Sequence, residues 1–318
     1  MRAIMQHETG GPEVLRLEEV PDPVPGEGEV LVAVAAAGVH VVDTAIRRGE
    51  AGPFGVASLP MTPGREVAGV VDLVGPGVDP SWLGRRVVVH LGTRNGGYAE
   101  RAVADAHRLH AVPDGVADGE AVALVGTGRT TVLVLDAARL EPDDVALVTA
   151  AAGGMGSLLT QAVRAAGATA VGLAGAPKLA HVDADVVVAY DEPGWGERVQ
   201  VALGERRPTV LFDGVGGDLG RAALELLAPR GRVVSYGYAA GAGPTPITQD
   251  DLWGRSLTAT VPLGPGLPAL APLEARALAS GWRPRLATFD LADAAAAHAA
   301  IEARATTGKV VLTVSRPG

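Results

Sequence analysis

The chain has 318 residues, of which 47% are hydrophobic and 20% charged, and its formal net charge at pH 7 is −9. At about 150 residues per domain, this length predicts two domains that can each bury a core. The acidic balance argues against binding along a nucleic-acid backbone, and the 3% of aromatic residues against a base-stacking surface. The absence of cysteine excludes disulfides, thiolate nucleophiles, Fe–S clusters and cysteine-ligated zinc.

No targeting or membrane segment is predicted. The N-terminal sequence MRAIMQHETGG has no apolar run of signal-peptide length. The longest weakly charged stretch, from Val145 to Pro177, contains Arg164 and several glycines, so it is expected to form a buried strand–helix–strand rather than a membrane span. We therefore expect a cytoplasmic protein with neither a membrane nor a nucleic acid as partner.

The first third of the chain is predicted to be rich in β-strands. Alternating apolar residues mark strands at 29–34, 67–74 and 86–90. Clusters of proline and glycine lie between them and predict tight turns. Short strands joined in this way are typical of a small barrel or sandwich.

The middle of the chain alternates between strands and helices. Residues 145–149 form a continuous apolar run, as expected for a strand buried on both faces. Further strands are predicted at 170–174, 185–189, 209–212 and 232–236, and helices at 157–166, 197–203 and 219–227. This alternation predicts an α/β domain with a doubly wound parallel sheet and helices on both faces. A helix at 291–303 and a strand at 309–314 are expected to end the chain.

A glycine-rich turn follows the first strand of this region. It reads Ala151-Ala152-Gly153-Gly154-Met155-Gly156 and precedes a predicted helix, which is the setting of a dinucleotide-binding turn. Gly153 would let the backbone approach a pyrophosphate, and Gly156 would let the helix pack closely on the strand. The N–H groups of the helix N-terminus would face the phosphates. Because Ala151 stands where the first glycine of such a turn is usual, a glycine turn without a ligand is the alternative.

The residues after the second strand of the predicted sheet indicate which dinucleotide is bound. An NAD site has an acidic residue about 20 residues beyond the glycines, where it binds the ribose hydroxyls. Here Gly175, Ala176 and Lys178 follow the strand, and the first acidic residue is Asp183. A lysine without a carboxylate favours the 2′-phosphate of NADPH. Lys178 and Lys309 are the only lysines of the chain, and a solvated loop lysine is the alternative for Lys178.

Several short motifs occur in one order along nearly the whole chain. They are GVHVVDT at 38–44, PGREVAG at 63–69, GYAE at 97–100, GTGRTT at 126–131, the glycine turn, FDGVGG at 212–217 and TGKVVL at 307–312. With these motifs the chain resembles the zinc-independent quinone oxidoreductases of the medium-chain dehydrogenase/reductase superfamily. No single motif is specific, but their number and order are.

The resemblance implies two domains and a cofactor site. Residues 1–118, completed by 265–318, would form a GroES-like catalytic domain, and residues 119–264 an inserted Rossmann domain that binds NADPH. The positions matching the family's 2′-phosphate site are Lys178, Tyr190 and Arg304. The other implied cofactor contacts are Thr127 near the nicotinamide, Gly153, Gly154, Met155 and Gly156 at the pyrophosphate, and Tyr236 and Gly237 in a loop beside the cofactor. Strand-end packing is the alternative for Tyr190, and a surface charge for Arg304.

The candidate catalytic residue is His40. Zinc-dependent relatives have a cysteine and a histidine where this chain has His40 and Arg65, and a guanidinium is no zinc ligand, so no metal site is expected. An imidazole near the nicotinamide can donate a proton or bind a carbonyl group. A polar wall residue, or a histidine bonded to Asp43, is the alternative. Ala45 replaces a usual tyrosine, which also alters the substrate pocket.

The other residues assigned to the substrate pocket are Asp43, Arg47 and Trp253. Asp43 and Arg47 lie one helical turn apart, which predicts an ion pair and a structural role for Asp43. Trp253 and Tyr238 are expected either to line the cleft or to belong to the core. Tyr98 is expected to be architectural.

The function that follows is hydride transfer from NADPH to a quinone or an α,β-unsaturated carbonyl compound, without zinc. The alternatives are an enoyl reductase that tailors a secondary metabolite, and an NADPH-binding sensor that has lost catalysis. The resemblance also implies a homodimer, in which the alternating segment 256–261 would be covered at the edge of the Rossmann sheet. The natural substrate, and whether the pocket with His40 and Ala45 keeps quinone activity, do not follow from the sequence.

Overall fold

The computed structural model describes residues 1–50, 58–239, 241–263 and 269–315. They form two compact units: the first unit comprises residues 1–128 and 274–318, and the second residues 129–273. The boundary predicted at 118/119 falls at the start of helix α2 (Asp118–Ala123). The boundary predicted at 264/265 lies outside the described residues, so the predicted domain bounds stay predictions.

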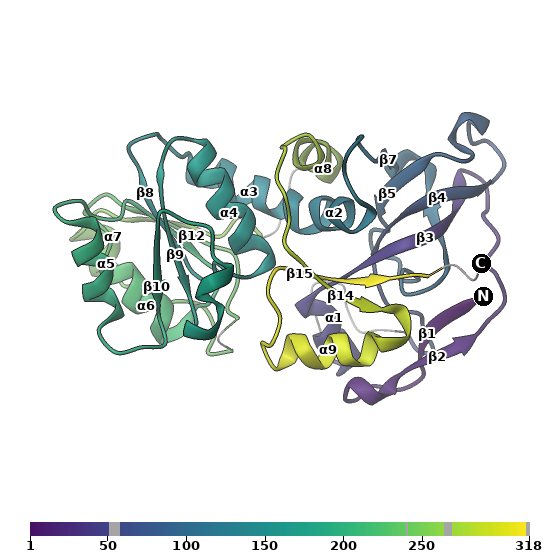
Figure 1. Cartoon of the computed structure of the whole chain (residues 1–318), viewed down its shortest axis with the longest axis horizontal. Helices are drawn as coiled ribbons and strands as arrows, with labels where there is room; N and C mark the ends of the chain where they lie inside the picture. Colours follow the sequence, from purple (N-terminus) through teal and green to yellow (C-terminus); the bar gives the residue numbers. More distant parts are fainter. Residues whose placement is uncertain (51–57, 240, 264–268, 316–318) are drawn as a thin grey trace. The chain divides into compact units, whose positions relative to one another are not determined.

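The second unit contains a six-stranded parallel sheet in the order β10-β9-β8-β11-β12-β13 (Figure 1). Its strands are β8 (Val145–Val148), β9 (Thr169–Ala174), β10 (Val186–Ala189), β11 (Val210–Asp213), β12 (Arg232–Ser235) and β13 (Thr258–Thr260). The chain runs outward from β8 to one edge, then returns to β11 and runs to the other. This is the Rossmann order, and it confirms the predicted doubly wound sheet.

Helices cover both faces of this sheet. They are α3 (Arg129–Ala138), α4 (Gly154–Ala165), α5 (Trp195–Leu203) and α6 (Gly217–Glu225). Successive strand residues point to opposite faces, so Leu147 packs with α5 and α6 while Val148 packs with α3 and α4. Burial on both faces explains why β8 reads as an unbroken apolar run.

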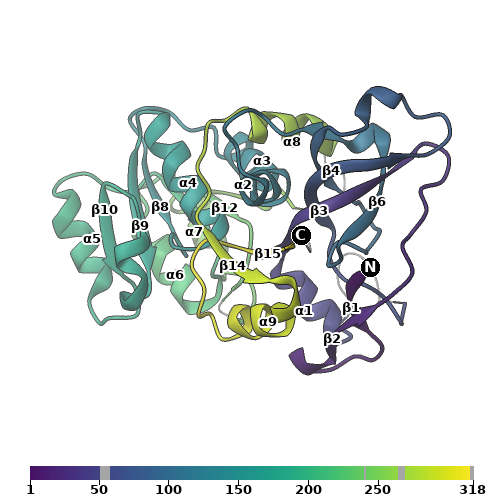
Figure 2. The same cartoon turned by 45° about the vertical axis from the view of Figure 1, so that its right-hand side comes forward.

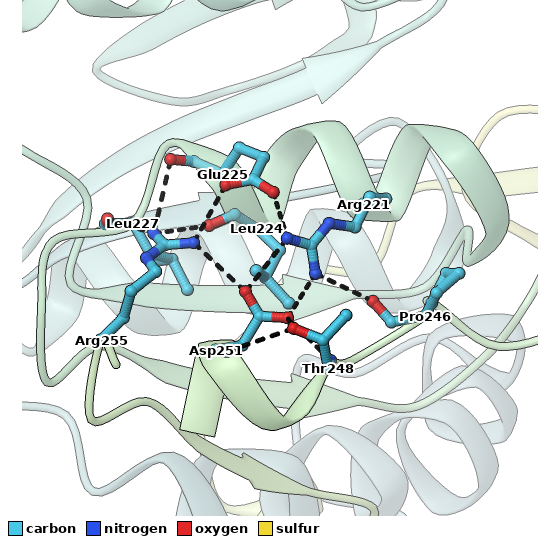
Figure 3. Close-up of polar contacts among 8 residues, drawn as sticks. All are labelled: Arg221, Leu224, Glu225, Leu227, Pro246, Thr248, Asp251 and Arg255. Carbon is cyan, nitrogen blue, oxygen red and sulfur yellow. Dashed lines mark hydrogen bonds and ion pairs between the residues drawn. The ribbon is translucent and has the colours of Figure 1, made fainter. Parts of the chain in front are cut away.

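An ion-pair network fixes α7 (Gln249–Trp253) to α6 (Figure 3). The Arg221 guanidinium contacts both Asp251 and Glu225, and its Nη2 lies 3.0 Å from Asp251 Oδ1. Arg255 donates to the Leu227 carbonyl at 2.7 Å, where the chain leaves α6. The hydrogen bond from Arg221 holds the pKa of Asp251 below its usual range. The network therefore anchors the segment that leads into edge strand β13.

The first unit is built on a seven-stranded sheet in the order β14-β15-β3-β4-β5-β7, with β6 also paired to β3, and on a separate β1–β2 pair (Figure 2). Its strands are β1 (Arg2–Gln6), β2 (Leu15–Glu19), β3 (Glu29–Val39), β4 (Glu66–Val74), β5 (Arg86–His90), β6 (Arg101–Asp105), β7 (His110–Ala111), β14 (Leu286–Asp290) and β15 (Lys309–Thr313). Strand β15 pairs antiparallel with β3, with Val311 opposite Gly38. The two ends of the chain thus build one sheet, as the resemblance implies.

The remaining helices complete the two units. They are α1 (Val41–Arg47), α8 (Leu270–Leu278) and α9 (Ala294–Glu302), and the 3₁₀ turns η1 (Pro12–Val14), η2 (Pro80–Trp82), η3 (Ala106–Arg108), η5 (Ala176–His181) and η6 (Leu291–Asp293). Helix α9 lies beside α1 in both views (Figures 1 and 2). This contact brings side chains of the C-terminal helix to the motif that carries His40 and Asp43.

One helical segment among the described residues, Asp118–Ala138, is long and apolar enough to span a membrane by length and composition. It consists of α2, the π-helical turn η4 (Leu124–Gly128) and α3. Because 67% of its most apolar window is buried inside the protein, it has the character of a core helix. The weakly charged stretch 145–177 forms β8, α4 and β9, as expected.

Candidate functional site

The glycine turn lies where the strand order of the parallel sheet reverses. Strands β8 and β11 are neighbours there, and Thr149, directly after β8, is joined by hydrogen bonds to the end of β11 and to the loop that follows it. The backbone N–H of Thr149 donates to the Phe212 carbonyl at 3.1 Å, and that of Gly214 donates to Thr149 Oγ1 at 2.9 Å. Open α/β sheets bind their ligands at such a reversal, beyond the carboxyl ends of the strands.

The turn itself requires small residues. A Cβ on Gly156 would lie 2.3 Å from the Ala150 carbonyl oxygen and 2.6 Å from Ala151 Cα, so α4 packs against the turn only with glycine there. Gly153 is the N-cap of α4 and provides no side chain to cap it. No acidic residue occupies the first turn of α4. This N-terminus fits a dinucleotide pyrophosphate, because a helix N-terminus attracts phosphate through its N–H groups and dipole.

Asp213 organises the loop that follows β11. Its buried Oδ1 accepts from the backbone N–H groups of Val215 and Gly216, each at 3.1 Å, and its Oδ2 accepts from Thr245 Oγ1 at 2.6 Å. These bonds give Asp213 a structural role in the loop. The neighbouring Tyr236 donates its hydroxyl to the Thr149 carbonyl at 3.3 Å, and burial raises its pKa well above the ordinary tyrosine value.

Lys178 and Tyr190 lie near the edge of the same sheet. Lys178 is in the 3₁₀ turn η5 after β9, and Tyr190 directly follows β10. Both side chains are partly exposed. Arg304 is exposed and belongs to the first unit, whereas Lys178 and Tyr190 belong to the second. The three-residue phosphate site therefore stays a prediction.

A carboxylate that sequence reasoning missed lies at this edge. The Ala176 N–H donates to both oxygens of Asp191, at 2.9 and 3.2 Å. A Cβ on Gly175 would lie 3.3 Å from Asp191 Oδ2. Asp191 is next to Tyr190 in the chain, so it places negative charge beside the expected phosphate site. The signal was present in the sequence, but at the end of the third strand of the sheet rather than the second.

In the first unit, His40 belongs to a buried polar cluster with Glu66 and Lys309. His40 Nε2 lies 2.6 Å from Glu66 Oε1 and 2.7 Å from Lys309 Nζ, and Lys309 Nζ lies 3.2 Å from Glu66 Oε2. The side chains of Glu66 and Lys309 are 1% and 5% exposed, whereas that of His40 is 29% exposed. His40 is thus the member of the cluster that a small molecule can reach. No local pattern in the sequence indicates this position of Lys309 beside His40.

Glycines of two motifs make room for the Glu66 carboxylate. A Cβ would lie 1.8 Å from Glu66 Oε1 on Gly126 and 2.4 Å from Oε2 on Gly38. Burial alone would raise the pKa of Glu66, but the charges of His40 and Lys309 outweigh it and hold that pKa well below its usual range. The glycines and the lysine therefore accommodate one buried carboxylate.

Asp43 bonds to the backbone of His40 but not to its ring. The His40 N–H donates to Asp43 Oδ2 at 2.8 Å, at the start of α1. The ring's partners are Glu66 and Lys309, so the alternative of a histidine ring bonded to Asp43 is wrong. The other Asp43 oxygen accepts from Arg65 Nη2 at 2.7 Å, and both side chains are buried.

The ion pair predicted between Asp43 and Arg47 is also wrong. Arg47 is 1% exposed and instead pairs with Glu302 of α9 at 2.6 Å. Its Nη1 lies 3.4 Å from Nδ1 of His298, whose Nε2 lies 3.2 Å from the Tyr98 hydroxyl. Asp43 and Arg47 thus each pair with a residue distant in sequence instead of with each other. The buried Tyr98 is architectural, as predicted.

A catalytic zinc does not fit these residues. The second ligand position of zinc-dependent relatives holds Arg65, a buried cation that already pairs with Asp43. The ammonium of Lys309 lies against both His40 and Glu66. Within residues 1–50, 58–239, 241–263 and 269–315, no group of three or more His, Asp or Glu side chains could hold a metal ion.

The remaining predicted residues lie in different settings. Thr127 is buried in the π-helical turn η4. Trp253 and Tyr238 are 81% and 62% exposed, so neither belongs to the core of its unit. Their assignment to a cleft, and the pocket roles of Asp43 and Arg47, stay predictions.

Comparison with known proteins identifies relatives of the whole chain. Residues 26–114 match the model of the alcohol dehydrogenase GroES-like domain, and residues 154–269 that of the zinc-binding dehydrogenases. Quinone oxidoreductase 1 of Escherichia coli is 32% identical and covers 96% of this chain and 97% of its own length. A 2-haloacrylate reductase of Burkholderia is also 32% identical, over 98% of each chain.

Solved structures of quinone oxidoreductases also match this chain over nearly its whole length. The Escherichia coli quinone oxidoreductase complexed with NADPH matches with a TM-score of 0.82 and 31% identity, over 98% of this chain and all of its own. The quinone oxidoreductase of Pseudomonas syringae pv. Tomato matches with a TM-score of 0.81 and 33% identity, over 98% of this chain and 99% of its own.

Proposed function

The chain belongs to the quinone oxidoreductase family of the medium-chain dehydrogenase/reductase superfamily, and we propose that it transfers hydride from NADPH to a quinone or an α,β-unsaturated carbonyl compound without zinc. The observation that carries this proposal is the cluster of His40, Glu66 and Lys309. It supplies an accessible imidazole at a position where zinc-dependent relatives have a metal ligand, with the buried ammonium of Lys309 beside it.

Since these residues do not fit zinc, no metal ion is expected to act as a Lewis acid on the substrate. This favours some classes of substrate over others. Reduction of a simple aldehyde concentrates charge on one alkoxide oxygen, which a metal ion stabilises well. Hydride addition to a quinone or an enone gives a phenolate or an enolate, whose charge is delocalised. Such a product needs less help, and a hydrogen bond or proton from His40 is sufficient.

The proposed roles of the residues combine the geometry of the glycine turn with the contacts that the resemblance implies. The α4 N-terminus with Gly153, Gly154, Met155 and Gly156 binds the pyrophosphate. The contacts assigned to the rest of NADPH are Thr127 at the nicotinamide, Tyr236 and Gly237 beside the cofactor, and Lys178, Tyr190 and Arg304 at the 2′-phosphate. The nicotinamide supplies the hydride, and the protein orients it and excludes water. His40 donates to the substrate oxygen.

The test is a substrate panel in which loss of NADPH absorbance is followed with quinones, enones, 2-haloacrylate and simple aldehydes. Oxidation of NADPH by quinones or enones, with aldehydes inert, is the expected result. Turnover of aldehydes alone would overturn the proposal. Turnover of enones or haloacrylate without quinones would favour the second candidate, an enoyl reductase, which the similarity to the 2-haloacrylate reductase supports. Tight NADPH binding without any turnover would indicate a sensor.

The proposed assembly is a cytoplasmic homodimer. Strand β13 is the edge of its sheet, and Thr258, Ala259 and Thr260 are all exposed. Exposed sheet edges are templates for pairing with another chain, and a two-fold axis would join two copies of β13. A monomeric mass in solution at micromolar concentration would refute the dimer.

A further inference from the structure

We propose that Asp191 sets the preference between two dinucleotides: its carboxylate accepts a hydrogen bond from the ribose 2′-hydroxyl of NADH and opposes the 2′-phosphate of NADPH, so that the protein binds both cofactors. This inference rests on the proposed function, because it concerns a residue of the same cofactor site. It goes beyond that function by adding NADH as a second cofactor and by giving the site a residue that acts against the phosphate.

Asp191 brings a carboxylate to the position where an NAD site has one. In such sites an acidic side chain at the end of the second strand, about 20 residues beyond the glycines, binds the ribose hydroxyls. Counted from Gly156, that position is Ala176, which has no polar side chain. The Ala176 N–H instead donates to Asp191, at 2.9 Å to Oδ1 and 3.2 Å to Oδ2. The carboxylate is thus present, but the chain supplies it from the segment that follows β10.

The pairing of β9 with β10 fixes this placement. The two strands are parallel neighbours, and just beyond β10 the Tyr190 N–H still donates to the Ala174 carbonyl at 3.1 Å. Asp191 is the next residue, so its side chain leaves the sheet beside Gly175. A Cβ on Gly175 would lie 3.3 Å from Asp191 Oδ2, so a larger residue there would press against the carboxylate.

The backbone at the start of η5 offers little to a phosphate. Phosphate groups bind where several N–H groups point out of a turn or a helix N-terminus. The Ala176 N–H is taken by Asp191, and Pro177 has no N–H. The Lys178 N–H donates to the Gly175 carbonyl at 2.8 Å. A 2′-phosphate therefore depends on side chains such as that of Lys178, and it meets the charge of Asp191 at the same turn.

The Asp191 carboxylate keeps the capacity to accept from a ribose hydroxyl. A carboxylate has about four lone-pair sites, and a single N–H leaves most of them open. Arg198 of α5, a cation at this loop, is directed at other groups: its Nη2 lies 3.1 Å from Glu192 Oε2, and its Nη1 donates to the Pro193 carbonyl at 2.8 Å. Asp191 and Glu192 are therefore adjacent carboxylates in different settings, one on the turn after β9 and one on an arginine.

The test measures the Kd of NADPH and of NADH by calorimetry in the wild type and in Asp191→Asn, which removes the charge and keeps the size. NADPH should bind about 3- to 10-fold more tightly to the variant, because a like charge near the phosphate is gone. NADH should bind on the order of 3-fold more weakly, because an amide oxygen accepts less strongly than a carboxylate. Glu192→Gln is the matched control: it removes the same charge from the next residue and should leave both Kd values unchanged.

Opposite shifts distinguish a specificity-determining residue from a structural one. If Asp191 only caps η5, Asp191→Asn changes both Kd values in the same direction or neither of them, and either result would overturn the inference. So would a wild type that binds NADPH more than about 1,000-fold more tightly than NADH. These outcomes leave the proposed function standing, because NADPH still binds. Binding of neither dinucleotide to the wild type would instead refute the proposed function, and the inference with it.

Discussion

Replacement of His298 by glutamine should reduce the loss of stability on acidification. His298 is fully buried, and burial, reinforced by the charge of Arg47, lowers its pKa to about 4. In the unfolded chain the pKa is about 6.5, so the unfolded state binds more protons between these values. Stability from this group is complete above about pH 6.5, falls as pH is lowered, and levels off below about pH 4. The full loss is about 3 kcal/mol, of which about 2 kcal/mol is reached by pH 5.

The assay is denaturant unfolding at about pH 7.5 and about pH 5 for both proteins. The wild type should lose about 2 kcal/mol more than His298→Gln between these values. His107→Gln is the matched control, because His107 is an exposed histidine of the same unit, and it should behave as the wild type. Equal losses for the wild type and His298→Gln would show that His298 is not held neutral by the fold.

Four further outcomes are expected. Lys178→Ala should weaken NADPH about 10- to 100-fold and leave NADH almost unchanged, since a charge-assisted hydrogen bond contributes about 1.5–3 kcal/mol; equal weakening of both in calorimetry would refute the phosphate contact. Asp191→Asn should raise the preference for NADPH over NADH in the same titrations, because it removes a carboxylate beside that phosphate. Gly126→Ala should lower the melting temperature sharply, since its Cβ would overlap a buried carboxylate, whereas Gly196→Ala, whose nearest neighbour would lie at 3.4 Å, should not. Ala259→Pro removes an N–H from the free edge of β13 and should lower the dimer fraction in sedimentation, and an unchanged fraction would place the dimer contact elsewhere.

The parallel sheet was predictable because short stretches of the sequence indicate its strands, turns and helices. The apolar run of β8, the glycine turn and α4 follow one another directly in the chain, and each is required by burial or close packing at that position. The strand predicted at 86–90 has the observed bounds. Helix α4 begins at Gly154 rather than at 157, because the glycines of the turn are themselves part of its first turn. Glycine has a low helix propensity, which hid this start.

The contacts of the first unit were not predictable from spacing. The helical-turn rule paired Asp43 with Arg47, but the fold offers each a partner from another element: Arg65 before β4 and Glu302 at the end of α9. Lys309 and His40 are likewise joined only because β15 pairs with β3. Such contacts depend on which strands lie next to each other in the sheet, and no short stretch of the sequence indicates this order.

The pairing of buried charges in the first unit independently supports a mechanism without a metal ion. Glu66 is buried against Lys309, and Asp43 is buried against Arg65, so each of these two buried carboxylates already has a buried cation. A buried charge without a partner destabilises a fold by several kcal/mol, roughly 3–5 when one partner of a buried pair is removed. A divalent cation at His40 would therefore add positive charge to a balanced set and would have to displace the Lys309 ammonium.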